Sequence, residues 1–237
     1  MTTIHANLQA VKDRIATACA AAQRDPATVT LLAVSKTWPA ACIREAAATN
    51  QRAFGENYVQ EAQAKQAELA DLDLQWHFIG PLQSNKTRSV AEHFSWVHSV
   101  ERLKIAARLS EQRPADLSPL NVCVQVNVSG EASKSGCAPA EAPALCHTIA
   151  TLPGLRLRGL MAIPEPTAEP AEMSALADSI TRRRFALLRE LRDTLVAEGL
   201  ALDTLSMGMS HDLEAAIMEG ATVVRIGTAI FGERQYA

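Results

Sequence analysis

The chain of 237 residues is 48% hydrophobic, which suits a substantial globular core, and we expect one domain over residues 1–237. The net charge is −3 and only 4% of residues are aromatic, so the composition argues against nucleic acid and anionic membrane surfaces as partners. The five cysteines form no CxxC pair, and we expect neither a disulfide framework nor a bound metal. No apolar run resembles a signal peptide or a transmembrane helix, and we expect a cytoplasmic protein.

The pattern along the chain begins with helical spacing over residues 4–24, which Pro26 ends, and then alternates between strand-like and helix-like segments. Strands are predicted over residues 29–35, 53–56, 75–79, 96–99, 121–128, 155–163, 205–209 and 223–226. Helices are predicted over residues 39–49, 58–70, 84–92, 102–112, 140–151, 171–198 and 212–219. We expect the buried face of helix 171–198 to carry Met173, Leu176, Ile180, Leu187, Leu191 and Leu195.

The predicted strands are nearly continuous apolar runs, which is typical of a parallel sheet covered on both faces. Eight strand–helix units in a chain of this length favour the α/β class and a (β/α)8 TIM-like barrel with an extra N-terminal helix. No GxGxxG motif follows the first strand, which argues against a dinucleotide-binding fold.

Polar residues gather where the predicted strands end, and in such barrels the carboxyl ends of the strands form the active face. The candidate site residues at these ends are Lys36, Asn57, Ser206, Ser210, Arg225, Gly227 and Thr228. Asparagine, serine and glycine are also ordinary turn formers, so any one of these positions has a purely structural alternative.

Lys36 closes the apolar run 29–34 and is the most informative of these residues. A partly desolvated lysine loses its proton easily and becomes an amine nucleophile, which is the chemistry of a Schiff base with an aldehyde. The alternative is a lysine at a strand end that reaches into solvent.

The last two units suggest a phosphate site, because barrels often bind phosphate after strands seven and eight. Ser210 is placed to cap a helix that starts at His211, and Gly227 and Thr228 offer amides and a hydroxyl at a helix start. We expect Asp212 to face away from this phosphate position.

A lysine that can form an imine, on the same rim as a phosphate site, fits pyridoxal 5′-phosphate, which carries an aldehyde and a phosphate on one ring. Arg225 can then donate to the pyridine nitrogen, because an arginine stays protonated. The alternative for Arg225 is a buried ion pair with Glu56 or Glu219.

Seven ordered motifs between about residues 26 and 234 resemble the pyridoxal phosphate homeostasis protein family (YggS/PROSC type). They are LLAVSKTWP, FGENYVQEAQAK, WHFIGPLQSNK, HSVE, QVNVSGEASKSG, GLMAIP and LSMGMSHDLEAAI…GATVVRIGTAIFG. The resemblance implies a fold type III barrel like the N-terminal domain of alanine racemase, with pyridoxal phosphate covalently on Lys36, its phosphate near Ser210, Gly227 and Thr228, and Arg225 near the pyridine nitrogen. His211 departs from the family pattern, in which we expect an acidic residue.

The resemblance also implies a function in intracellular vitamin B6 homeostasis, in which the protein supplies or buffers the cofactor and has pyridoxal phosphate-dependent apoenzymes as partners. We expect a monomer. The alternatives are a small pyridoxal phosphate-dependent amino-acid racemase or Schiff-base lyase, and a phosphosugar enzyme without cofactor. Racemisation needs an acid/base on each face of the substrate. Since we expect no second domain after Gly232 and expect His77 to be a packed strand residue, we assign no catalytic residue.

Overall fold

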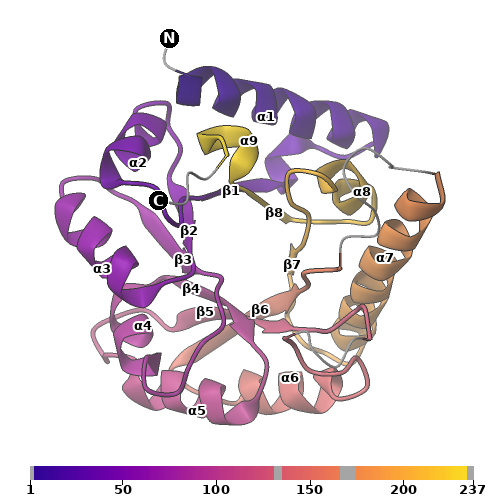
Figure 1. Cartoon of the computed structure of the whole chain (residues 1–237). Helices are drawn as coiled ribbons and strands as arrows, with labels where there is room; N and C mark the ends of the chain where they lie inside the picture. Colours follow the sequence, from indigo (N-terminus) through magenta and orange to yellow (C-terminus); the bar gives the residue numbers. More distant parts are fainter. Residues whose placement is uncertain (1–2, 131–134, 166–174, 234–237) are drawn as a thin grey trace.

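The computed structural model describes residues 3–130, 135–165 and 175–233. Within these residues eight parallel strands close into a barrel in chain order, with the helices around the outside (Figure 1). The strands are β1 (Thr30–Val34), β2 (Ala53–Glu56), β3 (Gln75–Phe78), β4 (Trp96–Val100), β5 (Leu120–Gln125), β6 (Leu155–Met161), β7 (Thr204–Ser206) and β8 (Val223–Ile226). The helices are α1 (Thr3–Ala21), α2 (Ala40–Ala47), α3 (Val59–Glu68), α4 (Thr87–His93), α5 (Leu103–Gln112), α6 (Ala142–Ala150), α7 (Ala175–Ala197), α8 (Leu213–Met218) and α9 (Thr228–Phe231), with a 3₁₀ turn, η1, at Pro26–Thr28.

Barrel closure depends on β1, which pairs in parallel with both β2 and β8. The register places Leu32 of β1 opposite Arg225 of β8 and Val34 opposite Gly55 of β2. The predicted (β/α)8 barrel is therefore confirmed. Because all eight strands run in the same direction, their carboxyl ends meet at one rim.

Side chains alternate between the barrel interior and the layer beneath the helices, as the pleat of a strand requires. Outward-facing residues such as Trp76, Phe78 and Val97 join the large core between strands and helices. The interior holds smaller apolar clusters, one around Leu32 and one around Trp96. Between them lies a polar layer of buried side chains, made up of His77, His98, Ser206 and Arg225.

The extra N-terminal helix is confirmed as α1, which lies along the outside of the barrel beside α8 and α9 (Figure 1). Its buried face carries Ile4, Leu8, Val11 and Ile15, spaced as an amphipathic helix requires. Polar side chains add to this contact, since Asn7 donates a hydrogen bond of 2.9 Å to the carbonyl of Ile230 at the end of the chain's last helix.

Three strands end two or three residues earlier than the sequence predicts. β5 stops at Gln125, β6 at Met161 and β7 at Ser206. Beyond β7 the backbone turns at Gly208, whose φ of +94° is incompatible with a continuing strand. The apolar residues directly after these strands remain buried in the core, and they are Val126, Ala162 and Met207.

The buried face of α7 also differs from the prediction. Phe185, Leu188 and Leu195 are fully buried, whereas Ile180 and Leu187 are 40% and 38% exposed. Met173 and the side chain of Leu176 lie outside the described residues. The prediction is confirmed for Leu195, which is buried, and for Leu191, which packs against the core, and it is wrong for Ile180 and Leu187.

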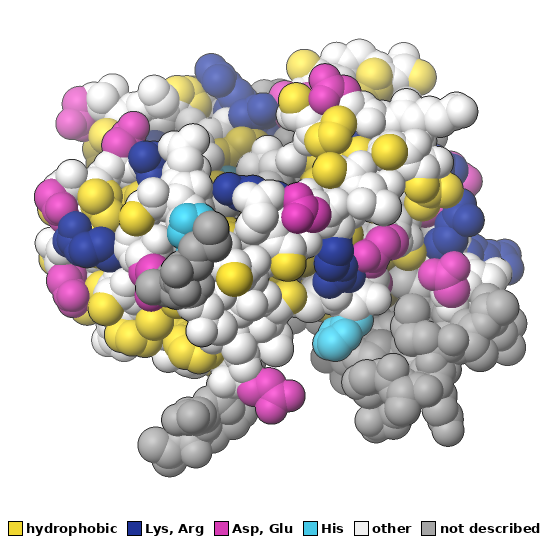
Figure 2. Space-filling model, turned by 90° about the horizontal axis from the view of Figure 1, so that it is seen from above, with side chains coloured by type: hydrophobic (Ala, Val, Ile, Leu, Met, Phe, Trp, Pro, Cys, Tyr) yellow, Lys and Arg dark blue, Asp and Glu magenta, His cyan; other side chains and the backbone are white. Residues whose placement is uncertain are grey.

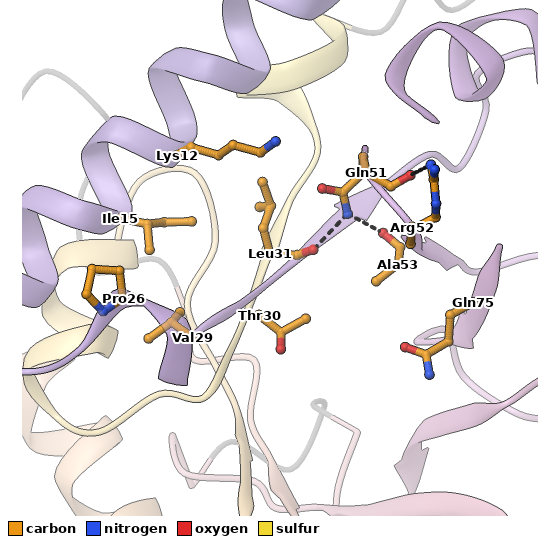
Figure 3. A pocket seen from close by; sticks show the side chains of 10 residues that line it. All are labelled: Lys12, Ile15, Pro26, Val29, Thr30, Leu31, Gln51, Arg52, Ala53 and Gln75. Carbon is orange, nitrogen blue, oxygen red and sulfur yellow. Dashed lines mark hydrogen bonds between the residues drawn. The ribbon is translucent and has the colours of Figure 1, made fainter. Parts of the chain in front are cut away.

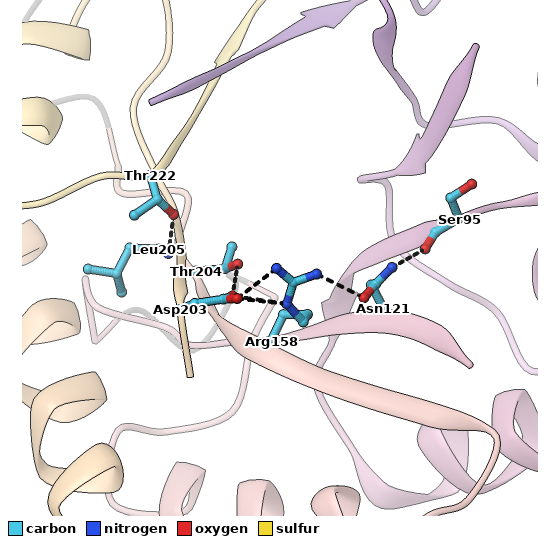
Figure 4. A network of polar contacts seen from close by, with 7 residues as sticks. All are labelled: Ser95, Asn121, Arg158, Asp203, Thr204, Leu205 and Thr222. Atoms are coloured by element: carbon cyan, nitrogen blue, oxygen red, sulfur yellow. Dashed lines mark hydrogen bonds and ion pairs between the residues drawn. The ribbon is translucent and has the colours of Figure 1, made fainter. Parts of the chain in front are cut away.

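The amino end of the barrel is closed by a polar network (Figure 4). The guanidinium of Arg158 on β6 binds both carboxylate oxygens of Asp203 and donates to Asn121 Oδ1 at 3.0 Å, and Asn121 in turn donates to the Ser95 carbonyl. This network ties together the starts of β4, β5, β6 and β7, so it stabilises the end of the barrel opposite the predicted site.

The face of the molecule shown in Figure 2 mixes charges of both signs with apolar side chains. None of the described helices is long and apolar enough to cross a membrane.

Candidate functional site

The predicted site residues all lie at or just beyond the carboxyl ends of β1, β2, β7 and β8, which are neighbours in the closed barrel. Lys36 follows β1 by two residues, and Asn57 follows β2 directly. Ser206 is the last residue of β7, and Arg225 lies within β8. The fold therefore brings these residues to one half of the rim.

The backbone around the half-buried Lys36 is fixed on both sides by side chains from β2 and α3. Before it, the Ser35 hydroxyl donates to Glu56 Oε1 at 2.6 Å, and the Ser35 carbonyl accepts from Lys65 Nζ at 2.8 Å. After it, the amide of Thr37 donates to Glu61 Oε1 at 2.6 Å. Thr37 has a φ of +68°, a costly conformation for a β-branched residue, which these contacts hold in place.

Lys65 connects the two halves of this cluster, because its ammonium also contacts Glu56 Oε1 at 2.8 Å and Glu61 Oε1 at 2.5 Å. Glu56 is fully buried. Desolvation raises the pKa of its carboxyl, and the charge and hydrogen bond of Lys65 oppose this rise. The cluster around residues 35–37 is thus a buried ion pair with a defined geometry.

Two buried acceptors at the end of β2 have no hydrogen-bond partner among the described residues. They are Glu56 Oε2 and Asn57 Oδ1, which belong to consecutive residues. A buried polar atom without a partner costs roughly 1–3 kcal/mol, so adjacent ones at a rim indicate a place where a ligand can donate hydrogen bonds.

Arg225 is buried and does not pair with either carboxylate that the sequence left open as a partner. Its guanidinium donates to the Ser206 carbonyl at 2.6 Å, to Ser206 Oγ at 2.8 Å and to the Ala162 carbonyl at 2.8 Å. Burial lowers its pKa to about 10, so it remains protonated near neutral pH. Glu219 instead binds Arg182 and Arg189, and Glu56 binds Lys65, so the ion-pair alternative for Arg225 is wrong.

The loop after β7 differs from the prediction in its helix start. Helix α8 begins at Leu213 with Asp212 at the N-cap position, so Ser210 does not cap a helix beginning at His211. The Asp212 carboxylate does not simply turn outward, because it accepts the amide of Met209 and so withdraws that amide from any ligand. Burial raises the pKa of Asp212, and the Met209 hydrogen bond opposes the shift.

Glycines allow close packing at both parts of the predicted phosphate position. A Cβ at Gly208 would lie 2.5 Å from Cβ of Ala216, and one at Gly227 would lie 3.2 Å from the Val34 carbonyl oxygen. Gly227 precedes the four-residue helix α9, which begins at Thr228 as predicted. Thr228 is exposed and Ser210 is half-buried, so both hydroxyls lie near the surface of the rim.

Three residues that fix the geometry of the site were not predicted from the sequence. His98 lies inside the barrel on β4, and the alternation Trp96–His98 within a predicted strand was the available signal. Lys65 stands four residues after Glu61 on a helix, a spacing that predicts an ion pair. Arg14 of α1 donates to the Ser210 carbonyl at 3.1 Å and to Glu214, a contact between distant segments that no local pattern indicates.

A cavity of about 450 Å³ lies at the opposite end of the barrel, between α1 and the starts of β1, β2 and β3 (Figure 3). Lys12 and Arg52 line it, and the buried amide of Gln51 donates to the carbonyls of Leu31 and Ala53 beside it. Because catalytic and binding groups of such barrels lie at the carboxyl rim, this cavity is not the candidate site. Within the described ranges no three histidine, cysteine, aspartate or glutamate side chains are grouped to hold a metal ion.

Comparison with known proteins places this arrangement in context. The family "Alanine racemase, N-terminal domain" matches residues 6–235. A pyridoxal phosphate homeostasis protein of Pseudomonas aeruginosa is 69% identical over 236 residues, covering 100% of this chain and 98% of the relative. A pyridoxal phosphate homeostasis protein of Escherichia coli K12 is 51% identical, covering 100% of this chain and 99% of the relative. The structure of PipY from Synechococcus elongatus with pyridoxal phosphate bound has a TM-score of 0.82 and 41% identity, covering 97% of this chain and 100% of that one.

Proposed function

Because the chain belongs to the pyridoxal phosphate homeostasis protein family, we propose that it binds pyridoxal 5′-phosphate as a Schiff base on Lys36 and serves in the homeostasis of that cofactor. The observation that carries the proposal is this half of the rim, where Lys36 stands between two fixed neighbours and shares the rim with Arg225 and the glycine-lined loops.

The residues present fit this cofactor. Asn57 Oδ1 is a buried acceptor without a partner among the described residues, as expected of a group that a ligand completes. Three of the five guanidinium N–H groups of Arg225 are used by Ser206 and Ala162, which fixes the plane in which the others point. When bound, the cofactor supplies an aldehyde for the lysine and an aromatic ring that stores electron density.

Each residue then has a defined task. Lys36 supplies the amine, Ser210, Gly227 and Thr228 bind the phosphate, and Arg225 donates a hydrogen bond to the ring nitrogen while Ser206 orients it. An arginine donates without giving up its proton, so the ring nitrogen stays neutral and the ring remains a weak electron sink. This arrangement suits retention and release of the cofactor better than turnover of amino acids.

We infer that the protein hands the cofactor to pyridoxal phosphate-dependent apoenzymes in the cytoplasm. One chain contributes every residue of the site, so a monomer suffices. The second candidate, a small racemase or Schiff-base lyase, is supported by the match to the alanine racemase N-terminal domain.

One experiment separates the two. The purified holoprotein is incubated with an apoenzyme acceptor, and separately with a panel of L- and D-amino acids. Our proposal predicts recovery of acceptor activity and no change in the amino acids. Racemised or cleaved amino acids with no transfer of cofactor would establish the enzymatic alternative instead.

A further inference from the structure

A continuous chain of hydrogen bonds crosses the barrel interior from Arg225 to the opposite end. Arg225 Nη1 contacts Ser206 Oγ at 2.8 Å, and Ser206 Oγ contacts His98 Nδ1 at 2.7 Å. His98 Nε2 contacts His77 Nδ1 at 2.9 Å, and His77 Nε2 contacts Gln75 Oε1 at 3.0 Å. The first four residues of this chain, from Arg225 to His77, are buried. The last, Gln75, is exposed beside the cavity of Figure 3.

The direction of the protons in this chain follows from its first member. Arginine has donors and no acceptor, so Ser206 Oγ accepts from Arg225. The single proton of the buried hydroxyl then needs an acceptor, which His98 Nδ1 provides at 2.7 Å. The opposite direction would leave this hydroxyl proton without its acceptor in a low-dielectric interior, which is unfavourable.

Each later link is fixed by the one before it. With Nδ1 as an acceptor, a neutral His98 carries its proton on Nε2 and donates it to His77 Nδ1. His77 in turn carries its proton on Nε2 and donates it to Gln75 Oε1. Every donor between Arg225 and Gln75 has one acceptor, and both rings are the same tautomer.

Both histidines are held neutral by their surroundings. Burial lowers the pKa of His77 to about 3. Burial also lowers the pKa of His98 well below its usual value, and His77 and Arg225 add to that shift. The rings therefore carry one proton each throughout the neutral range.

Aromatic packing fixes the planes of the two rings. His77 stacks on Trp96 with 5.4 Å between ring centroids and 5° between planes, and His98 packs against the same indole at 5.6 Å. The guanidinium of Arg158, held by the network of Figure 4, lies 4.7 Å from the centroid of the Trp96 ring. In addition, the pairing of β4 with β5 shifts register between Val97 and Val100, the segment that contains His98.

We propose that His98 is a positioning residue for the cofactor site, in which it orients the Ser206 hydroxyl and thereby holds the Arg225 guanidinium, with His77 and Gln75 completing a chain of fixed direction. The effect on the cofactor rests on the proposed function. The direction of the chain does not, because it is a property of the protein without cofactor.

The first test is ¹⁵N nuclear magnetic resonance of the cofactor-free protein at neutral pH. The expected result is a proton on Nε2 and none on Nδ1 in both His77 and His98. In Ser206→Ala, His98 loses the donor to its Nδ1, so its ring should no longer be held in one tautomer. A proton on Nδ1 of either ring in the wild type would overturn the proposal whether or not the protein binds pyridoxal phosphate.

The second test measures the coupling with His98→Leu, His98→Asn and the distant control His147→Asn. His98→Leu removes the acceptor for Ser206 and should weaken pyridoxal phosphate binding about threefold to tenfold, the effect of one net hydrogen bond. It should also shift the absorption band of the bound cofactor. Asparagine keeps an acceptor near the place of Nδ1 and should restore the wild-type band, and His147→Asn, on the exposed face of α6, should change nothing.

If folded His98→Leu binds pyridoxal phosphate with the affinity of the wild type and gives the same absorption band, His98 has no positioning role. If His98→Leu does not fold, His98→Asn decides, since a band unlike that of the wild type in this conservative variant would also overturn it. If no variant and no wild-type protein binds pyridoxal phosphate, the proposed function fails while the tautomer result stands by itself.

Discussion

At the scale of single residues, the rim combines two kinds of polar group. Some, such as Lys65 and Ser206, are fully occupied by other protein groups and fix geometry. Others, such as Asn57 Oδ1, lack a partner in the described part of the chain. Occupied groups should affect stability when they are removed, whereas groups that await a ligand should affect binding.

Removal of Lys65 is expected to destabilise the protein, because it leaves the buried Glu56 carboxylate without its partner. We expect Lys65→Met to lower the free energy of unfolding by about 3–5 kcal/mol, the usual cost of breaking a buried ion pair. The double variant Glu56→Gln/Lys65→Met removes the charge as well and should recover much of the loss. Urea unfolding of the wild type and both variants measures this.

The loss should also depend on pH. Desolvation raises the pKa of Glu56 above its usual value of 4.5, and without Lys65 it should rise further. A raised pKa means that the folded state binds the proton more tightly, so stability is greatest below the usual value and falls as pH rises. The free energy of unfolding of Lys65→Met should therefore lie further below that of the wild type at pH 8 than at pH 5. An equal deficit at both pH values would contradict the ion pair between Lys65 and Glu56.

The phosphate hydroxyls should affect affinity and not stability. A hydrogen bond to a charged group contributes about 1.5–3 kcal/mol, so Ser210→Ala and Thr228→Ala should each weaken pyridoxal phosphate binding about tenfold to a hundredfold. Thr148→Ala removes a comparable hydroxyl on α6, which donates to the Ala144 carbonyl in the same helix, and serves as the control. Dephosphorylated pyridoxal should bind poorly to the wild type and be insensitive to the two rim variants.

At the scale of elements, α1 contacts both loops of the proposed phosphate site. Arg14 binds the Ser210 carbonyl and Glu214 of α8, and Asn7 binds the carbonyl of Ile230 in α9. The N-terminal helix therefore supports the phosphate loops from outside.

We expect Arg14→Ala to weaken pyridoxal phosphate binding about threefold to tenfold, because the Ser210 loop loses one fixed contact. Stability should change by less than about 1 kcal/mol, since the pair with Glu214 is largely exposed. The matched control is Arg44→Ala, whose guanidinium likewise binds a carboxylate, Asp71, and a backbone carbonyl but lies away from the site. Equal affinities of the two variants, measured by cofactor titration, would show that α1 does not support the loop that carries Ser210.

The elements themselves were largely predictable, since each apolar run became a strand or a helix of the closed barrel. What the sequence did not predict depends on contacts between distant segments. The chain from Arg225 to Gln75 joins four strands, and the Ser210 contact joins α1 to the β7 loop. The predicted burial of Ile180 and Leu187 was wrong for a related reason, because the part of a helix surface that meets the core is decided only in the assembled barrel.

At the scale of the whole molecule, the two ends of the barrel have separate roles. The carboxyl rim carries the candidate site, and the amino end carries the network of Arg158 and the buried amide of Gln51. Such separation lets the loops of a barrel vary without loss of its fold.

This separation predicts opposite effects of two single substitutions. Gln51→Leu deprives the carbonyls of Leu31 and Ala53 of their shared donor and should lower stability by about 1–3 kcal/mol without changing the affinity for pyridoxal phosphate. Ser210→Ala should do the reverse. Thermal unfolding and cofactor titration on the same samples give both numbers, and a loss of affinity in Gln51→Leu at a temperature where it is fully folded would contradict the separation.

The Schiff base between Lys36 and pyridoxal phosphate is tested most directly by borohydride reduction of the loaded protein, followed by mass mapping of its peptides. Reduction makes a Schiff base permanent, so the modified residue is read from the mass. We expect one adduct, on the peptide that contains Lys36, and we expect it to be absent from a folded Lys36→Ala variant. An adduct on another lysine of the wild type, with Lys36 unmodified, would contradict it.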